Sequence, residues 1–438
     1  MTENGGGKAS STALIRTIGR WSLTALVINS IIGSGIFGLP SVVSGHVGRM
    51  APLAYFIAGA GMAAISGCLA EVASQFDETG GPYLYARETL GRFWGIQIAW
   101  MMWLSRIAAA SGTANLFTTY LGQVFPRATE PVYRLAILTT LVGFLAVVNY
   151  VGVKSGARTS DFFTALKLLL LGTFVGAGLL WIGAHGTVAA TPLAHAIEPH
   201  DWLEATLVLV YAYGGFEAVL LATGEMRDPR HDVPIALMVG IASVVVIYTL
   251  VQVVVGGTLS DPAATQRPIA DSAMAVLGPR AAAAISIGAL FSIYGYLSAN
   301  MLHTPRLTFA LAERGDIPAV FARIHPKFRT PDVSIVLYTA FLLTFTLAGS
   351  FRWNITLSAI VRLFAYGSIA IALLILRKRN PDADAFRLPA GRVLAVVAIL
   401  FCLVLLVRAP LSNSTVVLAT VAAAALNWAL VRNRPSNA

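Results

Sequence analysis

Two glycines that flank a serine, inside a long apolar run, are the first candidates for chemistry. Residues 21–44 are mostly apolar, and Gly33-Ser34-Gly35 falls near their middle. Glycine permits unwinding of a helix, and unwinding here would free backbone N–H groups at the positive end of the following half-helix, where they suit a carboxylate. Small residues also allow close helix crossings, so this motif alone leaves both interpretations open.

The residues from Gly33 to Gly38 also match the spacing G-x-G-x-x-G. This dinucleotide-binding fingerprint requires a strand before it and a helix after it. Here it lies within one apolar run, so we expect no dinucleotide and no other cofactor.

A second pair of glycines interrupts the apolar run at 203–226. The segment from Tyr211 to Glu217 has Gly214-Gly215 at its centre, between aromatic residues and an acid. Matching interruptions in two halves of a chain indicate a transporter with inverted repeats and a binding site at the membrane midplane. The aromatic residues suit ordinary packing or a pocket wall, and beside a broken backbone we favour the wall. The candidate binding residues are Ile32, Gly33, Ser34, Gly35, Tyr211, Ala212, Tyr213, Gly214 and Glu217.

Lys167 and Glu217 are ionisable residues deep within apolar runs. A charge at the centre of a spanning helix costs roughly 2.5–3.5 kcal/mol, so it usually faces a bundle interior or water. Lys167 lies on the order of 13 Å below the predicted membrane face, and burial disfavours the charged form of lysine. It is a candidate for proton loading and release, or for a permanent structural pair.

Arg106 and Arg362 also lie within apolar runs. Arginine stays charged, so neither can carry the proton. Each could pair with Glu217, tie helices together or contact a carboxylate substrate. We favour structural pairing.

The chain is far more apolar than a soluble domain. Of 438 residues, 56% are hydrophobic and 12% are charged, with a mean hydropathy of +0.72, whereas soluble domains carry about 25% charged residues. The apolar run after the polar tail is too long for a signal-peptide core and lacks a cleavage site, so we expect a retained span. Cys68 and Cys402 fall inside apolar runs, and we expect neither a disulfide nor a metal site.

Twelve apolar runs are long enough to cross a hydrocarbon core of about 30 Å as helices, and irregular chain cannot cross lipid. They lie near 21–44, 50–72, 94–122, 131–150, 159–184, 203–226, 234–257, 280–310, 333–350, 355–376, 390–409 and 412–431. With both termini in the cytosol, the cytosolic segments hold 21 of the 31 Lys and Arg residues and the outer loops hold seven. This bias fits the positive-inside rule. The net charge of +10 therefore reflects topology and not nucleic-acid binding.

Several short motifs follow one another in a fixed order. The first two are Ile31 to Phe37 and Gly80 to Tyr85. The third is Tyr211 to Glu217, which continues through Glu225 and Asp228-Pro229 to Pro234. The fourth combines Pro305 to Leu307 with Ala322 to Ile324, and the fifth combines Leu376 to Lys378 with Phe386 to Pro389. Over nearly all of its length the chain thereby resembles the amino acid–polyamine–organocation (APC) superfamily of permeases. Asp77 departs from the pattern, because the family often has proline at this position before the Gly-Gly turn.

The resemblance implies an all-α integral membrane fold with twelve transmembrane helices. It implies a five-plus-five inverted repeat with unwound helices 1 and 6 (LeuT-like). We expect a disordered cytosolic tail at 1–20, a single transporter domain at 21–431 and a cytosolic tail at 432–438. The repeats cover about 21–184 and 203–376, and helices 11 and 12 lie at about 390–431.

The resemblance also implies roles for the candidate residues. Ser34 and Gly35 would donate to the substrate carboxylate, and carbonyl groups around Tyr211 to Tyr213 would accept from its ammonium group. Lys167 follows Arg158 in a stretch similar to proton-coupled members, in which a lysine replaces a sodium ion.

We therefore expect an amino acid carrier in the plasma membrane, with amino acids and protons as partners and an open oligomeric state. Neutral substrates are favoured, because Glu217 is the one deep acid and a polyamine or cationic amino acid antiporter usually needs more. A membrane enzyme is disfavoured, since no HExxH pattern occurs and the histidines are expected in or near loops. A carrier-like sensor or channel would need a signalling domain or a continuous pore.

Overall fold

The computed structural model describes residues 19–76, 81–152, 157–193, 195–226, 228–381 and 385–432, and this part of the chain is helical without strands. Its α-helices are α1 (Arg20–Ile31), α2 (Gly35–Val47), α3 (Ala51–Ala73), α4 (Gly81–Leu90), α5 (Arg92–Leu121), α6 (Pro131–Val151), α7 (Ala157–His185), α8 (Pro199–Tyr213), α9 (Pro229–Thr258), α10 (Pro268–Leu277), α11 (Pro279–Glu313), α12 (Asp332–Ala348), α13 (Phe351–Arg379), α14 (Gly391–Leu406) and α15 (Leu411–Val431). Short 3-10 helices are η1 (Gly48–Met50), η2 (Pro126–Thr129), η3 (Phe216–Glu225), η4 (Pro262–Ala264) and η5 (Ala319–Ala322).

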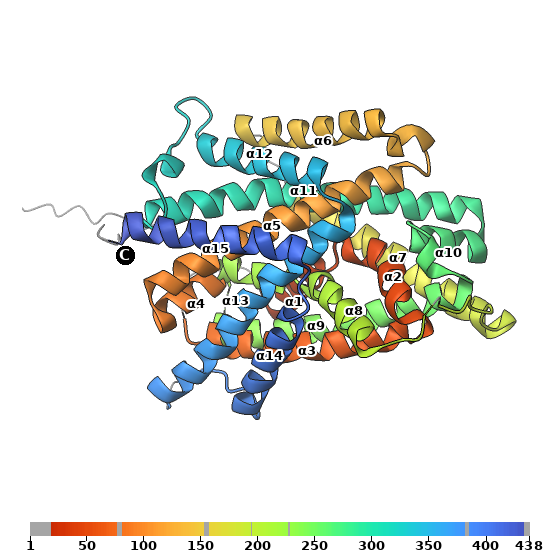
Figure 1. Cartoon of the computed structure of the whole chain (residues 1–438), viewed down its shortest axis with the longest axis horizontal. Helices are drawn as coiled ribbons and strands as arrows, with labels where there is room; N and C mark the ends of the chain where they lie inside the picture. The colour runs from red at the N-terminus through yellow and green to blue at the C-terminus, as the bar shows by residue number, and fades with distance from the viewer. Residues whose placement is uncertain are drawn as a thin grey trace, which may run out of the picture.

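The long helices form a bundle, with α4 and the C-terminal end of α15 at one end and α10 at the other (Figure 1). In the described part, eight helices or helical stretches are long and apolar enough to cross a membrane. They are Gly35–Ala73, Pro131–Val151, Lys167–His185, Pro199–Leu220, Pro229–Thr258, Pro279–Glu313, Phe351–Arg379 and Leu411–Val431. The chain is thus a multi-pass membrane protein.

Each of the twelve predicted runs contains helix, and two of them are divided. The run at 21–44 is split between α1 and α2, and the run at 203–226 between α8 and η3. The helices α10, α12 and α14 are apolar but shorter than a typical span. The number twelve therefore remains a prediction.

The sequence prediction missed α4 and α10. The motif from Gly80 to Tyr85 was expected to form a turn, whereas α4 begins at Gly81, with Pro82 next. This expectation was wrong because Gly-Pro suits the first turn of a helix as well as a loop. Several predicted features lie outside the described residues: Asp77, Gly80, the tail residues 1–18 and 433–438, and the side chains of Arg158 and Glu225.

The helix α5 lies at the centre of the packing. It contacts α13, α11, α4, α15 and α12, while α3 packs against α9, α14 and α13. Apolar side chains on outer helices remain exposed, among them Phe144, Leu180 and Leu418. The outer surface is therefore apolar, as the core is, and lipid in a bilayer would solvate it.

A buried carboxylate ties four elements together at the predicted cytosolic end. Asp316 has a 1% exposed side chain and forms ion pairs with Arg87 at 3.1 Å and Arg92 at 2.9 Å. Tyr83 of α4 donates a hydrogen bond to Asp316, and burial together with this bond raises the pKa of Tyr83 to about 12. Asn427 of α15 donates to the Asp316 carbonyl at 2.7 Å. The cluster joins α4, α5 and α15 to the end of α11.

We expect Asp316→Asn to destabilise the fold strongly. Removing one partner of a buried ion pair costs about 3–5 kcal/mol, and we expect the lower end because the side chains of Arg87 and Arg92 are 15% and 20% exposed. The measurement is the thermal unfolding midpoint in detergent. The control is Asp228→Asn, whose pair with His231 is exposed and should contribute less than about 1 kcal/mol. Similar midpoints for both variants would contradict the prediction.

Candidate functional site

The first break is the non-helical segment of residues 32–34 between α1 and α2. The carbonyl of Ile28 accepts from the Ile32 N–H at 2.9 Å, and the Ile31 carbonyl accepts from the Gly33 N–H at 2.8 Å. The last carbonyls of a helix and its first N–H groups have no partner within that helix. The first break therefore brings acceptors from α1 close to donors from α2.

The second break is Gly214-Gly215, between α8 and η3. Gly215 has a φ of +116°, in the region that glycine adopts readily and other residues do not. Its N–H donates to Oε2 of Glu217 at 3.0 Å. Glycine is thus required here by the backbone conformation.

The two breaks, taken with the helix ends that flank them, contact each other directly. A Cβ atom added to Gly35 would lie 3.0 Å from the Cα of Ala212, and one added to Gly215 would lie 2.5 Å from the Ser30 carbonyl oxygen. The Tyr248 hydroxyl of α9 lies 3.1 Å from the Ile31 carbonyl and 3.4 Å from that of Ala212. A single hydroxyl therefore bridges the ends of α1 and α8.

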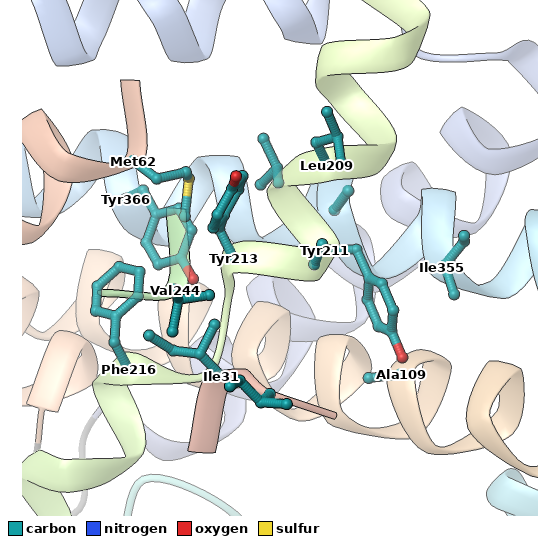
Figure 2. Close-up of a cluster of buried hydrophobic side chains, with 14 of the residues drawn as sticks. Ile31, Met62, Ala109, Leu209, Tyr211, Tyr213, Phe216, Val244, Ile355 and Tyr366 are labelled. Carbon is teal, nitrogen blue, oxygen red and sulfur yellow. The ribbon is translucent and has the colours of Figure 1, made fainter. Parts of the chain in front are cut away.

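The side chain of Ser34 connects the first break to α5 and α8. Its buried hydroxyl lies 2.7 Å from Oγ1 of Thr113 and 2.6 Å from the Tyr211 hydroxyl. Figure 2 shows Tyr211 extending from α8 toward Ala109 of α5, whose carbonyl accepts from Thr113 at 2.8 Å. Three hydroxyl groups therefore meet at the first break.

Tyr213 points the other way. In Figure 2 it lies among Met62 and Tyr366, away from Tyr211. Its hydroxyl donates to the Tyr55 carbonyl at 2.9 Å. Of the two predicted tyrosines, the structure brings only Tyr211 to Ser34 by its side chain.

Lys167 of α7 reaches the first break. Its Nζ donates to the carbonyls of Asn29 at 3.0 Å and Ile32 at 2.6 Å, and the residue is 8% exposed. These carbonyls lie at the end of α1, where the helix dipole is negative and favours a cation. The ammonium group thus holds α7 against the unwound end of α1.

Glu217 and Arg362 form a buried pair beside the second break. Nη1 of Arg362 lies 3.8 Å from Oε1 of Glu217, and Nε of Arg362 donates to the Ser105 hydroxyl at 2.9 Å. The Tyr366 hydroxyl donates to the second carboxylate oxygen at 3.2 Å. Glu217 therefore connects the second break to α13.

Arg106 follows Ser105 on α5 but does not join this pair. It acts electrostatically on Tyr296 and His303 of α11, and no described residue accepts a hydrogen bond from its Nε. The position of His303 also corrects an expectation, because it lies inside α11 and not in or near a loop. The predicted apolar run at 280–310 contains His303, so the sequence itself already placed this histidine within a helix.

Sequence reasoning missed Thr113, Tyr248, Ser105 and Tyr366. No local motif marks them, although each is a polar or amphipathic side chain within an apolar helix. Their partners are distant in the chain, as with Tyr248 and Ile31. A sequence pattern alone does not reveal such contacts.

Comparisons with known proteins match almost the entire chain. A family model described as amino acid permease matches residues 18–430. The serine/threonine exchanger SteT of Bacillus subtilis is 29% identical over 88% of this chain and 89% of its own length. In the same organism, a methylthioribose transporter is 26% identical over 90% and 89%. The branched-chain amino acid permease BcaP is 26% identical over 90% and 88%. All three relatives are transporters.

Proposed function

The chain belongs to the amino acid permease family, and on that premise we propose that it is a secondary carrier of amino acids in the plasma membrane, working by proton-coupled symport or exchange. The observation that carries this proposal is the direct contact between the two helix breaks, at Gly35 with Ala212 and at Gly215 with Ser30. Paired half-helix ends offer N–H donors and carbonyl acceptors within one small volume. An amino acid presents the matching carboxylate and ammonium groups.

The first N–H groups of α2, together with Ser34 and Gly35, would bind the substrate carboxylate, because the helix dipole is positive there. The carbonyl groups around Tyr211 to Tyr213 would accept from the ammonium group. The Ser34 hydroxyl bonds to Tyr211 of α8, so substrate binding at Ser34 would also affect the helix that ends at the second break. The ring of Tyr296 lies 3.6 Å from a Cβ added at Gly33 and would face the substrate side chain.

Neutral amino acids are the substrates that the buried charges support best. Glu217 already accepts from Gly215 and Tyr366 and pairs with Arg362, so it is engaged and not free to bind a cationic side chain. The exchanger and the branched-chain permease are named for neutral amino acids. A polyamine or cationic amino acid antiporter is the alternative. The methylthioribose transporter adds one sugar derivative to the candidates.

We further propose the LeuT-like inverted repeat of residues 21–184 and 203–376, with twelve spans and cytosolic termini. The matching positions of the breaks, α1–α2 in the first half and α8–η3 in the second, support it. The helices α14 and α15 would lie outside the repeat. A sensor or channel with the same fold would retain the breaks but would not accumulate substrate.

Counterflow in proteoliposomes tests the proposed function. Among vesicles loaded with each of the common amino acids in turn, those loaded with neutral amino acids should take up labelled neutral amino acids. Amidated or N-acetylated derivatives should fail to compete, because each lacks one of the charges that the breaks would bind. Competition by polyamines or methylthioribose, with no amino acid active, would overturn the proposal.

A further inference from the structure

Three side chains from three helices meet at the predicted extracellular end of the bundle. Nε2 of His46 on α2 lies 2.8 Å from Nη2 of Arg352 on α13. Nδ1 of His46 lies 3.6 Å from Oε2 of Glu204 on α8, and Nη2 of Arg352 lies 3.7 Å from the same oxygen. We name His46, Glu204 and Arg352 the outer clamp.

The outer clamp joins the far ends of the helices that form the proposed site. The first break lies at the start of α2, the second at the end of α8, and Arg362 lies in α13. Along each helix, the clamp residue is about 14–17 Å from the site residue, at 1.5 Å per residue. The ring of Phe351, next to Arg352 at the start of α13, reaches α2, since a Cβ at Gly38 would lie 2.5 Å from it. Separating these helices would open a path to the breaks.

A cavity of about 550 Å³ lies near this end of the molecule and is lined in part by Asp261, Ala264 and Arg267. The neighbouring Ala263 lies 3.7 Å from a Cβ added at Gly45 of α2. His46 itself is 8% exposed, while the side chains of Glu204 and Arg352 are 45% and 59% exposed. A proton from the aqueous side has a short route to the histidine.

We infer that His46 is a second proton-binding site, separate from Lys167, whose protonation releases α13 from α2. In the observed geometry Nε2 of His46 must accept from the Arg352 guanidinium, which has no acceptor of its own. A proton on Nε2 would turn this contact into two opposed cationic donors. The imidazolium would then attract Glu204, so the connection of α2 shifts from α13 to α8.

The groups that act electrostatically on His46 come from three places. Arg352 lies on α13, Glu204 and Asp201 lie on α8, and His195 lies in the segment before α8. Asp201 already binds the Glu198 N–H and contacts His195 and His200. Arg352 is therefore the group whose contact with His46 changes from a hydrogen bond to repulsion on protonation. Burial and Arg352 oppose a proton on His46, whereas Glu204 and Asp201 favour it. An acidic outer side would therefore be needed to protonate His46 and change the state of the outer clamp.

The role of His46 in opening the outer path rests on the proposed function, because a carrier must open this path before substrate binds from outside. Acid on the outer side would open the path when protons are available to drive uptake. The structural step can nevertheless be measured without transport. Failure of amino acid uptake would overturn the proposed function and leave the proton-dependent opening to be judged separately.

The test is the alkylation rate of Val42→Cys, one turn from His46 on the side toward the first break. Cys68 and Cys402 are buried, so labelling with a membrane-impermeant maleimide reports the new thiol. Rates are divided by those of the denatured protein at the same pH, which removes the intrinsic pH dependence of the thiol. From about pH 7.5 to about pH 5.5 we expect a rise on the order of 5-fold.

His46→Gln in the same background should abolish this rise. His200→Gln is the matched control, because His200 contacts Glu198 and Asp201 on its own helix end, and it should leave the rise intact. Arg352→Gln should give fast labelling at both pH values. An equal rise with and without His46, or no rise in the Val42→Cys protein, would overturn the inference.

Discussion

Replacing Gly215 by alanine is expected to weaken substrate binding at least about tenfold and to impair transport with it. Gly215 has a φ of +116°, and forcing a non-glycine residue into such a conformation costs about 1–3 kcal/mol. The added Cβ would also lie 2.5 Å from the Ser30 carbonyl. This contact is with backbone, so it cannot be relieved by a change of rotamer. The second break would move away from the first, and the proposed donors and acceptors would separate.

Gly278→Ala separates the effect of backbone strain from the effect of the clash with Ser30. Gly278 has a φ of +84°, and no atom lies within 4 Å of an added Cβ. Its substitution imposes backbone strain without disturbing a helix contact, and it should leave uptake nearly normal. For Gly215→Ala we expect at least about a tenfold loss of affinity, equivalent to about 1.4 kcal/mol. Initial uptake rates and ligand-induced thermal shifts measure it, with gel filtration as the check of folding. Equal activity in both variants would show that contact between the breaks is not needed.

The breaks themselves were predictable, because glycine leaves a local signal in an apolar run. The division of 21–44 at Gly33 and of 203–226 at Gly214 follows from the low helix propensity of glycine. What could not be predicted is which atoms of the two breaks touch. The contact of Gly215 with Ser30 joins residues far apart in the chain, and it depends on how several helices pack together.

Charges within the apolar runs were found from sequence, but their partners were not. The sequence named no partner for Lys167, and the structure gives it the carbonyls of Asn29 and Ile32. Arg106 and Arg362 looked equivalent, yet only Arg362 lies beside Glu217. A one-dimensional pattern gives the depth of a charge in the membrane. The helix face on which it lies, and the neighbour on that face, follow from packing.

Short helices were missed for a different reason. The α4 segment mixes tyrosine, arginine and glutamate after Gly81-Pro82, so it has neither the length nor the apolar character of a span. Its stability comes from tertiary contacts such as Tyr83 with Asp316. Most short helices in proteins depend on such packing and not on intrinsic propensity.

Lys167→Ala is expected to remove proton-driven accumulation while leaving exchange. The end of α1 stabilises the protonated lysine through the helix dipole and the carbonyls of Asn29 and Ile32, whereas burial opposes the charge. If the end of α1 moves when the site switches between facing outside and facing inside, the carbonyls no longer stabilise the charged lysine. Burial then favours the neutral form, and the proton can leave. This links proton release to motion of the first break. With one proton per substrate, a gradient of one pH unit sustains about tenfold accumulation, since one unit equals about 1.4 kcal/mol. The Lys167→Ala variant should show almost no accumulation of substrate in response to this gradient.

Lys167→Arg distinguishes coupling from a structural role. Arginine can still donate to the carbonyls of Asn29 and Ile32, but it does not release its proton in the physiological range. If Lys167 only holds α7 against α1, the Arg variant should accumulate substrate in vesicles with an alkaline lumen, as the unmodified protein does. If Lys167 carries the proton, the Arg variant should fold and exchange substrate yet lose the response to the gradient. Gradient-driven uptake that persists in the Ala variant would rule out Lys167 as the coupling residue, and the energy source would then have to lie elsewhere in the bundle.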